Sequence, residues 1–142
     1  MTPGIYNLGD IAISVAMTDE VITVSSNSLD EFIGNLDGLD SVTLQCHFSH
    51  GGGGATVKCD IETSLDQGLT WIDIARFAFT TTTDVKIANL TTKTPVTTFY
   101  TPVTLADNTA VDGILGDMLR AKLTTTGTYT GATTISVRAH VR

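Results

Sequence analysis

One eight-residue segment constrains the fold of this chain more than any other. Residues 64–71 read S-L-D-Q-G-L-T-W, and an alternating run, residues 72–79, follows at once. The carboxylate of Asp66 can accept hydrogen bonds from backbone N–H groups of a tight turn. Gly68 can adopt the positive φ that ends such a turn, and Trp71 can begin the next strand as a large apolar anchor. We therefore predict a β-hairpin centred on this segment.

The segment also resembles the Asp-box, a hairpin motif of pattern S-x-D-x-G-x-T-W. That motif is repeated in sialidase-like propellers and occurs singly in unrelated β domains. A propeller repeats blades of roughly 40–50 residues several times, whereas this chain has one copy of the motif in 142 residues. The resemblance therefore implies a structural turn and not a sialidase. The matching residues are Ser64, Asp66, Gly68, Thr70 and Trp71.

Threonine runs at 80–83 and 124–126 and a general excess of β-branched residues favour pleated strands. Helical periodicity is almost absent, which excludes a parallel α/β fold. We predict an all-β fold: an antiparallel β-sandwich, immunoglobulin-like or jelly-roll, with about eight strands and at most one short helix. The 142 residues form one domain. The expected strands are 5–8, 11–17, 21–25, 41–49, 55–64, 71–80, 85–91, 118–124 and 133–141, with an extended segment at 96–105 and one helical turn within 28–36.

Two further hairpins are expected. The first joins strands 41–49 and 55–64 through the glycine run 51–54, which would place Cys46 opposite Cys59 on the buried face. Buried, reduced thiols are the favoured reading, and a disulfide formed later is the alternative. The second hairpin joins the last two strands, 118–124 and 133–141.

Metal and catalytic sites receive little support. His47 points away from Cys46 by strand alternation and His50 lies in a glycine-rich loop, so the four Cys and His side chains do not converge on a zinc ion. Asp37 and Asp40 flank Gly38, but a calcium loop needs more oxygen ligands in register.

No catalytic motif is present. Asp60 and Glu62 alternate on one strand face and could do acid–base work, but a solvated strand face is the favoured explanation. The glycine run precedes a strand and not a helix, so it is not a phosphate-binding loop. We expect no enzyme activity, no cofactor and no metal.

Charge and hydropathy limit the classes of partner that this chain can have. A net charge of −7 argues against nucleic acid, because phosphate binding needs a basic stripe. No apolar run is long enough for a transmembrane helix, and residues 1–4 lack the features of a secretory signal. We therefore expect assembly in a cytoplasm, with no membrane partner.

Two segments, 57–79 and 116–141, resemble small, threonine-rich β-sandwich proteins in the virions of tailed bacteriophages. The resemblance implies a capsid decoration (cement) protein on the outer capsid surface, with the major capsid protein and copies of itself as partners, in a homotrimer. A tail, head–tail connector or baseplate protein is one alternative. A carbohydrate-binding module, suggested by the Asp-box and Trp71, is the other, although Trp71 is expected to be a core residue because Ile72 and Ile74 take the other face of its strand.

Such a protein acts through its surface, and two candidate contacts stand out. Residues 1–9, with Ile5, Tyr6 and Leu8, could be an extended docking arm or an ordinary edge strand, and the sequence leaves both open. The adjacent aromatics Phe99 and Tyr100 should point to opposite sides of an extended segment, which would expose one of them.

Overall fold

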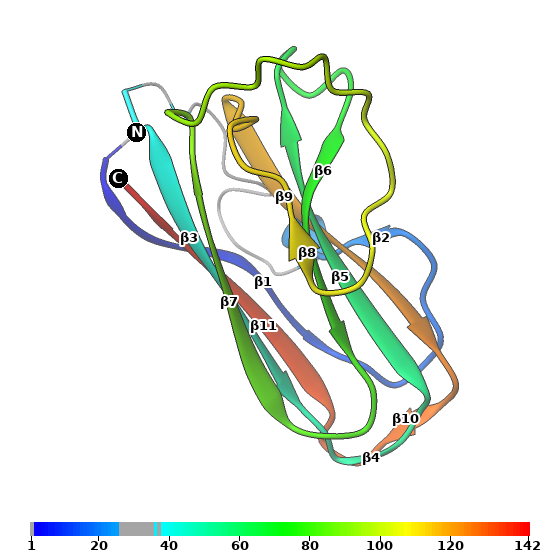
Figure 1. Ribbon diagram of the computed structural model, residues 1–142. Helices are drawn as coiled ribbons and strands as arrows, with labels where there is room; N and C mark the ends of the chain where they lie inside the picture. The colour runs from blue at the N-terminus through cyan, green and yellow to red at the C-terminus, as the bar shows by residue number, and fades with distance from the viewer. Residues whose placement is uncertain (1, 26–35, 37) are drawn as a thin grey trace.

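The computed structural model describes residues 2–25, 36 and 38–142. It confirms the all-β prediction: two antiparallel sheets face each other across one apolar core (Figure 1). Sheet A has the order β1 (Gly4–Ala12), β11 (Thr134–Val141), β3 (Ser41–Ser49), β7 (Asp84–Thr91). Sheet B has the order β2 (Glu20–Val21), β9 (Met118–Thr126), β5 (Thr56–Ser64), β6 (Ile72–Phe79), β8 (Thr109–Ala110).

Alternation of apolar and polar residues predicted the long strands well. Each of the six segments predicted from residue 41 onward is a strand in the structure, with ends within two residues of those expected. In β3, β9 and β11 every second side chain is buried, as one-sided burial requires. The buried side chains of both sheets form the core, among them Leu44, Phe48, Ile61, Leu123 and Ile135.

Both additional hairpins were predicted wrongly. β3 lies in sheet A and β5 in sheet B, and β9 and β11 are separated in the same way. Each of these connections therefore carries the chain across the core from one sheet to the other. Alternation shows which side of a strand is apolar, but it does not show which sheet the strand joins.

The two crossings lie side by side at the lower end of Figure 1, where β4 (Gly52–Gly53) pairs with β10 (Tyr129–Thr130). The glycine run is needed for this close approach. Gly54 has a φ of +76°, and a Cβ built on it would lie 2.1 Å from the ring of Tyr129. The Tyr129 ring is buried, and its hydroxyl donates to the carbonyl of Thr80 at 2.7 Å.

The N-terminal third differs most from expectation. The strand predicted at 5–8 and the first two residues of the one predicted at 11–17 belong to one strand, β1, with a register shift between Asn7 and Gly9, whereas residues 13–17 are not in a strand. The strand predicted at 21–25 is reduced to β2 and a helical turn, α1 (Ile22–Ser25). Thr23 explains the change, because its buried hydroxyl donates to the carbonyl of Leu8 and accepts from the N–H of Ala121. The helical turn predicted within 28–36 lies outside the described residues, apart from position 36.

Candidate interaction surface

The turn at residues 64–71 connects β5 to β6 and is fixed by side-chain hydrogen bonds. Asp66 accepts from both the N–H (2.8 Å) and the hydroxyl (2.6 Å) of Thr70. The Ser64 hydroxyl donates to Asp66 at 2.9 Å and accepts the N–H of Gly68 at 2.7 Å. The bonds from Thr70, its hydroxyl first, lower the pKa of Asp66 below its ordinary value. The turn is therefore rigid, and Gly68 has a φ of +88°.

Trp71 is not a core residue, contrary to the expectation for it. It is half-buried on the outer side of sheet B, and the Arg120 guanidinium lies 4.1 Å from the centre of its ring. A cation over an indole face is stabilising. The side chain thus anchors the hairpin from outside the sandwich.

The sequence left two alternatives for the N-terminal segment, an extended docking arm or an ordinary edge strand. In the structure it is an edge strand. β1 pairs along its length with β11, so residues 4–12 are already part of sheet A. Of its three candidate contacts, Leu8 is fully buried, Tyr6 is partly buried against the core, and Ile5 is 71% exposed. Ile5 alone among the three remains available as an apolar surface group.

The structure separates the two adjacent aromatics as expected. Phe99 is fully exposed. Tyr100 is half-buried, and its hydroxyl is buried without a hydrogen-bond partner in the described part of the chain. Both residues belong to the long connection between β7 and β8, which contains no strand.

Three connections meet at the end of the sandwich that is uppermost in Figure 1: the turn 64–71, the segment after β7, and residues 111–117. A Cβ built on Gly113 would lie 3.0 Å from Val96, and one built on Gly116 would lie 3.0 Å from Leu65. Asp112 braces the region by accepting from the N–H of Thr91 and the hydroxyl of Thr94. We call this region the loop end.

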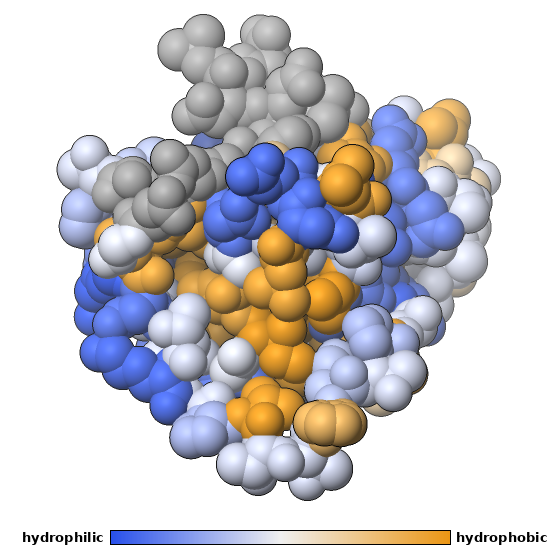
Figure 2. All heavy atoms as spheres, turned by 90° about the horizontal axis from the view of Figure 1, so that it is seen from above, coloured by the Kyte–Doolittle hydropathy of each residue, from blue (hydrophilic) through white to orange (hydrophobic). Residues whose placement is uncertain are grey.

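The loop end exposes large apolar side chains. Leu65 is 62% exposed, Leu69 85% and Val96 46%, and Phe99 follows three residues later on the same connection. Figure 2, which looks down on this end, shows apolar atoms gathered near the centre of the face and polar atoms around them. The sequence predicted Phe99 as a candidate surface contact. It did not predict Leu65 and Leu69, which were regarded only as residues of the turn.

A charged cluster covers the outer face of sheet B. Asp60 and Glu62 are only 1% and 4% exposed, so their assignment to a solvated face was wrong. Arg76 binds both carboxylate oxygens of Asp60, at 2.6 and 2.9 Å. Glu62 accepts from Arg120 and from Lys122, the latter at 2.9 Å. Neighbouring strands supply every partner, which a single strand's pattern could not reveal.

The cluster contains a third acid, Asp73 on β6. Burial and the negative charge of Asp60 raise its pKa to about 6, and a hydrogen bond with Glu62 adds to the shift. For Glu62 itself, burial is outweighed by the hydrogen bonds from Lys122 and Arg120, which hold its pKa below the ordinary value.

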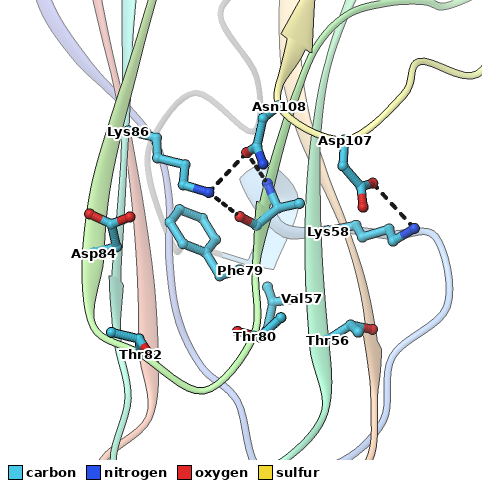
Figure 3. Close-up of a pocket in the computed structure, with 11 residues that line it drawn as sticks. Thr56, Val57, Lys58, Phe79, Thr80, Thr82, Asp84, Lys86, Asp107 and Asn108 are labelled. Carbon is cyan, nitrogen blue, oxygen red and sulfur yellow. Dashed lines mark hydrogen bonds and ion pairs between the residues drawn. The ribbon is translucent and has the colours of Figure 1, made fainter.

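The groove between the edges of the two sheets is lined by both polar and apolar side chains (Figure 3). Lys86 of β7 reaches across it and donates to the Ala78 carbonyl and to Asn108, while Asn108 accepts the Ala78 N–H at 3.0 Å. Lys58 and Asp107 form an ion pair of 3.3 Å on the other side. Side chains therefore form hydrogen bonds with the backbone N–H and carbonyl of Ala78 on β6. These bonds protect this edge from pairing with another strand.

The metal candidates do not come together. His47 lies on the outer side of β3, and His50 bonds the Gly53 carbonyl at 2.9 Å. Asp40 is ion-paired with Lys93 at 2.7 Å, and Asp37 lies outside the described residues. Among the residues the structure describes, no group of three or more His, Cys, Asp or Glu side chains is placed to hold a metal ion.

Within the described ranges, no helix is long and apolar enough to cross a membrane. No protein family, curated protein or solved structure matches this chain.

Proposed function

We propose that this chain is a structural virion protein of the capsid decoration type, which binds the outer surface of a capsid and stabilises the shell. The observation that carries the proposal is the loop end, whose connections leave Leu65, Leu69, Val96 and Phe99 exposed. Large apolar groups held outside a well-filled core favour contact with another protein.

The loop end is suited to docking because it is already ordered. Asp66 fixes the turn that carries Leu65 and Leu69, and Asp112 fixes the connection that carries Val96. A surface that is rigid before binding loses little conformational entropy on binding, so more of the contact energy is retained as affinity. Exposed aromatic and leucine side chains can then fill pockets on the partner.

The proposed assembly is a homotrimer on the capsid. The resemblance to phage virion proteins supports this state, and a ring closed by identical contacts would give it. Each copy would contribute one loop end, so a trimer would bind the shell through three equivalent patches. Linked patches raise the overall avidity without any new contact.

A binding experiment tests the proposal. Capsids that lack this chain would be titrated with purified protein, and co-sedimentation would measure the bound fraction. We expect Leu69→Ser and Phe99→Ser each to weaken binding by about tenfold or more, as loss of a buried apolar anchor does. Ile87→Ser is the matched control, because Ile87 is 64% exposed on sheet A, away from the loop end.

Equal binding by all four proteins would show that the loop end is not the docking surface. Absence of binding by the unmodified protein would overturn the decoration role itself. Density of this chain in rings of six or twelve at a vertex or tail would instead favour a connector, tail or baseplate protein.

A carbohydrate-binding role is less well supported. Stacking on a sugar requires a free aromatic face, and one face of the Trp71 ring is covered by Arg120. A glycan array with no bound sugar would remove this alternative.

A further inference from the structure

The charged cluster on sheet B contains more than surface ion pairs. Asp73 and Glu62 are directly opposite each other on neighbouring strands β6 and β5, beside the register shift between Ile61 and Glu62. Two carboxylates this close repel each other when both are ionised. The pair therefore favours a proton on one of its two carboxyl groups, and the titrations of the two acids are coupled.

The neighbouring groups decide which acid holds the proton. Glu62 accepts from Arg120 and Lys122 of β9, so it is the ionised member. Asp73 has no comparable cation of its own: Lys122 is already bonded to Glu62, and Arg76 on its own strand is bonded to Asp60. The proton therefore belongs to Asp73, the acid whose pKa is raised.

The other charged groups around the pair lie further out. Asp19 is 3.8 Å from Lys122, and Asp107 is 3.9 Å from Arg76. Residues 102–104 line one hollow together with Trp71, Asp73 and Lys122, and contribute no titratable group to it. Because Asp107 also pairs with Lys58 on β5, residues 102–107 run across the outer face of sheet B as a strap.

We propose that Asp73 and Glu62 form a pH-sensitive link between β6 and β5 on the outer face of sheet B. In mildly acidic solution one shared proton joins β5 to β6 beneath the strap. Near neutral pH the proton leaves, a third negative charge enters the cluster, and the strap and the adjoining end of β6 loosen. This inference does not depend on the proposed function.

The pH range follows from the direction of the shift. The pKa of Asp73 is raised from an ordinary 3.8 to about 6. Its contribution to stability is therefore complete below about pH 4 and is lost as the pH rises through about 6. A shift of this size caps the effect at about 100-fold in the unfolding equilibrium constant. Asp73 is partly exposed, so solvent screening reduces the expected change to the order of tenfold.

Trp71 is a built-in reporter, because it is the only tryptophan of the chain and lines the same hollow as Asp73. We expect its fluorescence to change with a midpoint near pH 6 in the unmodified protein. Asp73→Asn mimics the protonated acid and should abolish that transition. Asp84→Asn, which removes an exposed carboxylate from sheet A, should leave it unchanged.

Thermal unfolding supplies an independent readout. Between pH 5 and 7.5, stability should fall in the unmodified protein relative to Asp73→Asn. The comparison with Asp73→Asn is needed because histidines as a class titrate in the same pH range and would contribute to the pH dependence of both proteins. Identical pH profiles for the two proteins would overturn the proposal.

Carbon NMR of the aspartate carboxyl groups in the unmodified protein decides the matter even if the variant fails to fold. One aspartate should titrate near pH 6. No aspartate midpoint above pH 5 would also overturn the proposal.

Discussion

Cys46 of β3 and Cys59 of β5 face each other across the core from opposite sheets. Both side chains are fully buried and both are free thiols. The hydrogen bond from Cys46, then burial, raises the pKa of the Cys59 thiol well above its ordinary value. The thiolate is the reactive form of cysteine, so the raised pKa suppresses reaction at Cys59, and complete burial keeps reagents away from both thiols.

We therefore predict that the native protein resists thiol reagents. A water-soluble aromatic disulfide at pH 8 should label neither cysteine on the timescale of minutes, and should label both in urea. The measurement is the absorbance of the released thiolate. Rapid labelling of the folded protein at either position would contradict the buried pair.

The hydrogen bonds of the turn at 64–71 predict a loss of stability in Asp66→Ala. The substitution removes the acceptor for two groups of Thr70 and for Ser64. By comparison with lost helix caps, the melting temperature should fall by roughly 3–6 °C. Leu69→Ser in the same turn is the control, because Leu69 is exposed and should leave the melting temperature unchanged. Equal melting temperatures for Asp66→Ala and the parent protein would show that Asp66 does not hold the turn.

Breaking the buried ion pair on sheet B should be costly. Asp60→Ala leaves Arg76 with its guanidinium largely buried and without its bidentate partner. Removing one member of such a pair destabilises by about 3 kcal/mol or more, whereas replacing both by apolar groups can be nearly neutral. Urea unfolding of Asp60→Leu, Arg76→Met and Asp60→Leu/Arg76→Met forms a double-mutant cycle, and Asp60→Ala measures the cost of the unpaired Arg76 separately. Additive losses in the double variant would mean that the pair is not coupled.

The crossing of the two connections predicts that Gly54→Ala is far more damaging than Gly38→Ala. Both glycines have positive φ, at +76° and +82°, so alanine strains the backbone about equally at each. A Cβ at Gly54 would overlap the Tyr129 ring, whereas one at Gly38 would have no atom of the described residues within 4 Å. We expect a loss of about 1 kcal/mol for Gly38→Ala from backbone strain. Gly54→Ala should lose about 2 kcal/mol more from overpacking. Similar unfolding free energies for the two variants would contradict the close packing at the crossing.

The sequence predicted which residues are strands better than it predicted how the strands are arranged. Leu119, Ala121 and Leu123 alternate with charged residues, and that alternation depends on nothing outside β9. The neighbours of β9 depend on the crossings, and neither crossing has a sequence signature that distinguishes it from a hairpin loop. The turn after Ser64 could be predicted because its hydrogen bonds are local.

The same distinction explains the candidate sites. Phe99 could be found because two adjacent aromatics on an extended segment cannot both be buried. Leu65 and Leu69 form a surface only where residues 92–96 and 111–117 come beside them in the fold. Asp60 and Glu62 are buried by Arg76 and Arg120 from neighbouring strands, and Asp73 joins them only through the pairing of β5 with β6. Those relationships are set by tertiary structure.

Electron microscopy of virus particles that contain this chain would show whether the protein lies on the capsid and which of its ends binds the shell. We expect density for the β-sandwich on the outer surface of the head, with the loop end of Leu65, Leu69, Val96 and Phe99 against the capsid shell. Particles whose outer head surface lacks this chain, or a bound chain whose loop end faces solvent, would contradict it.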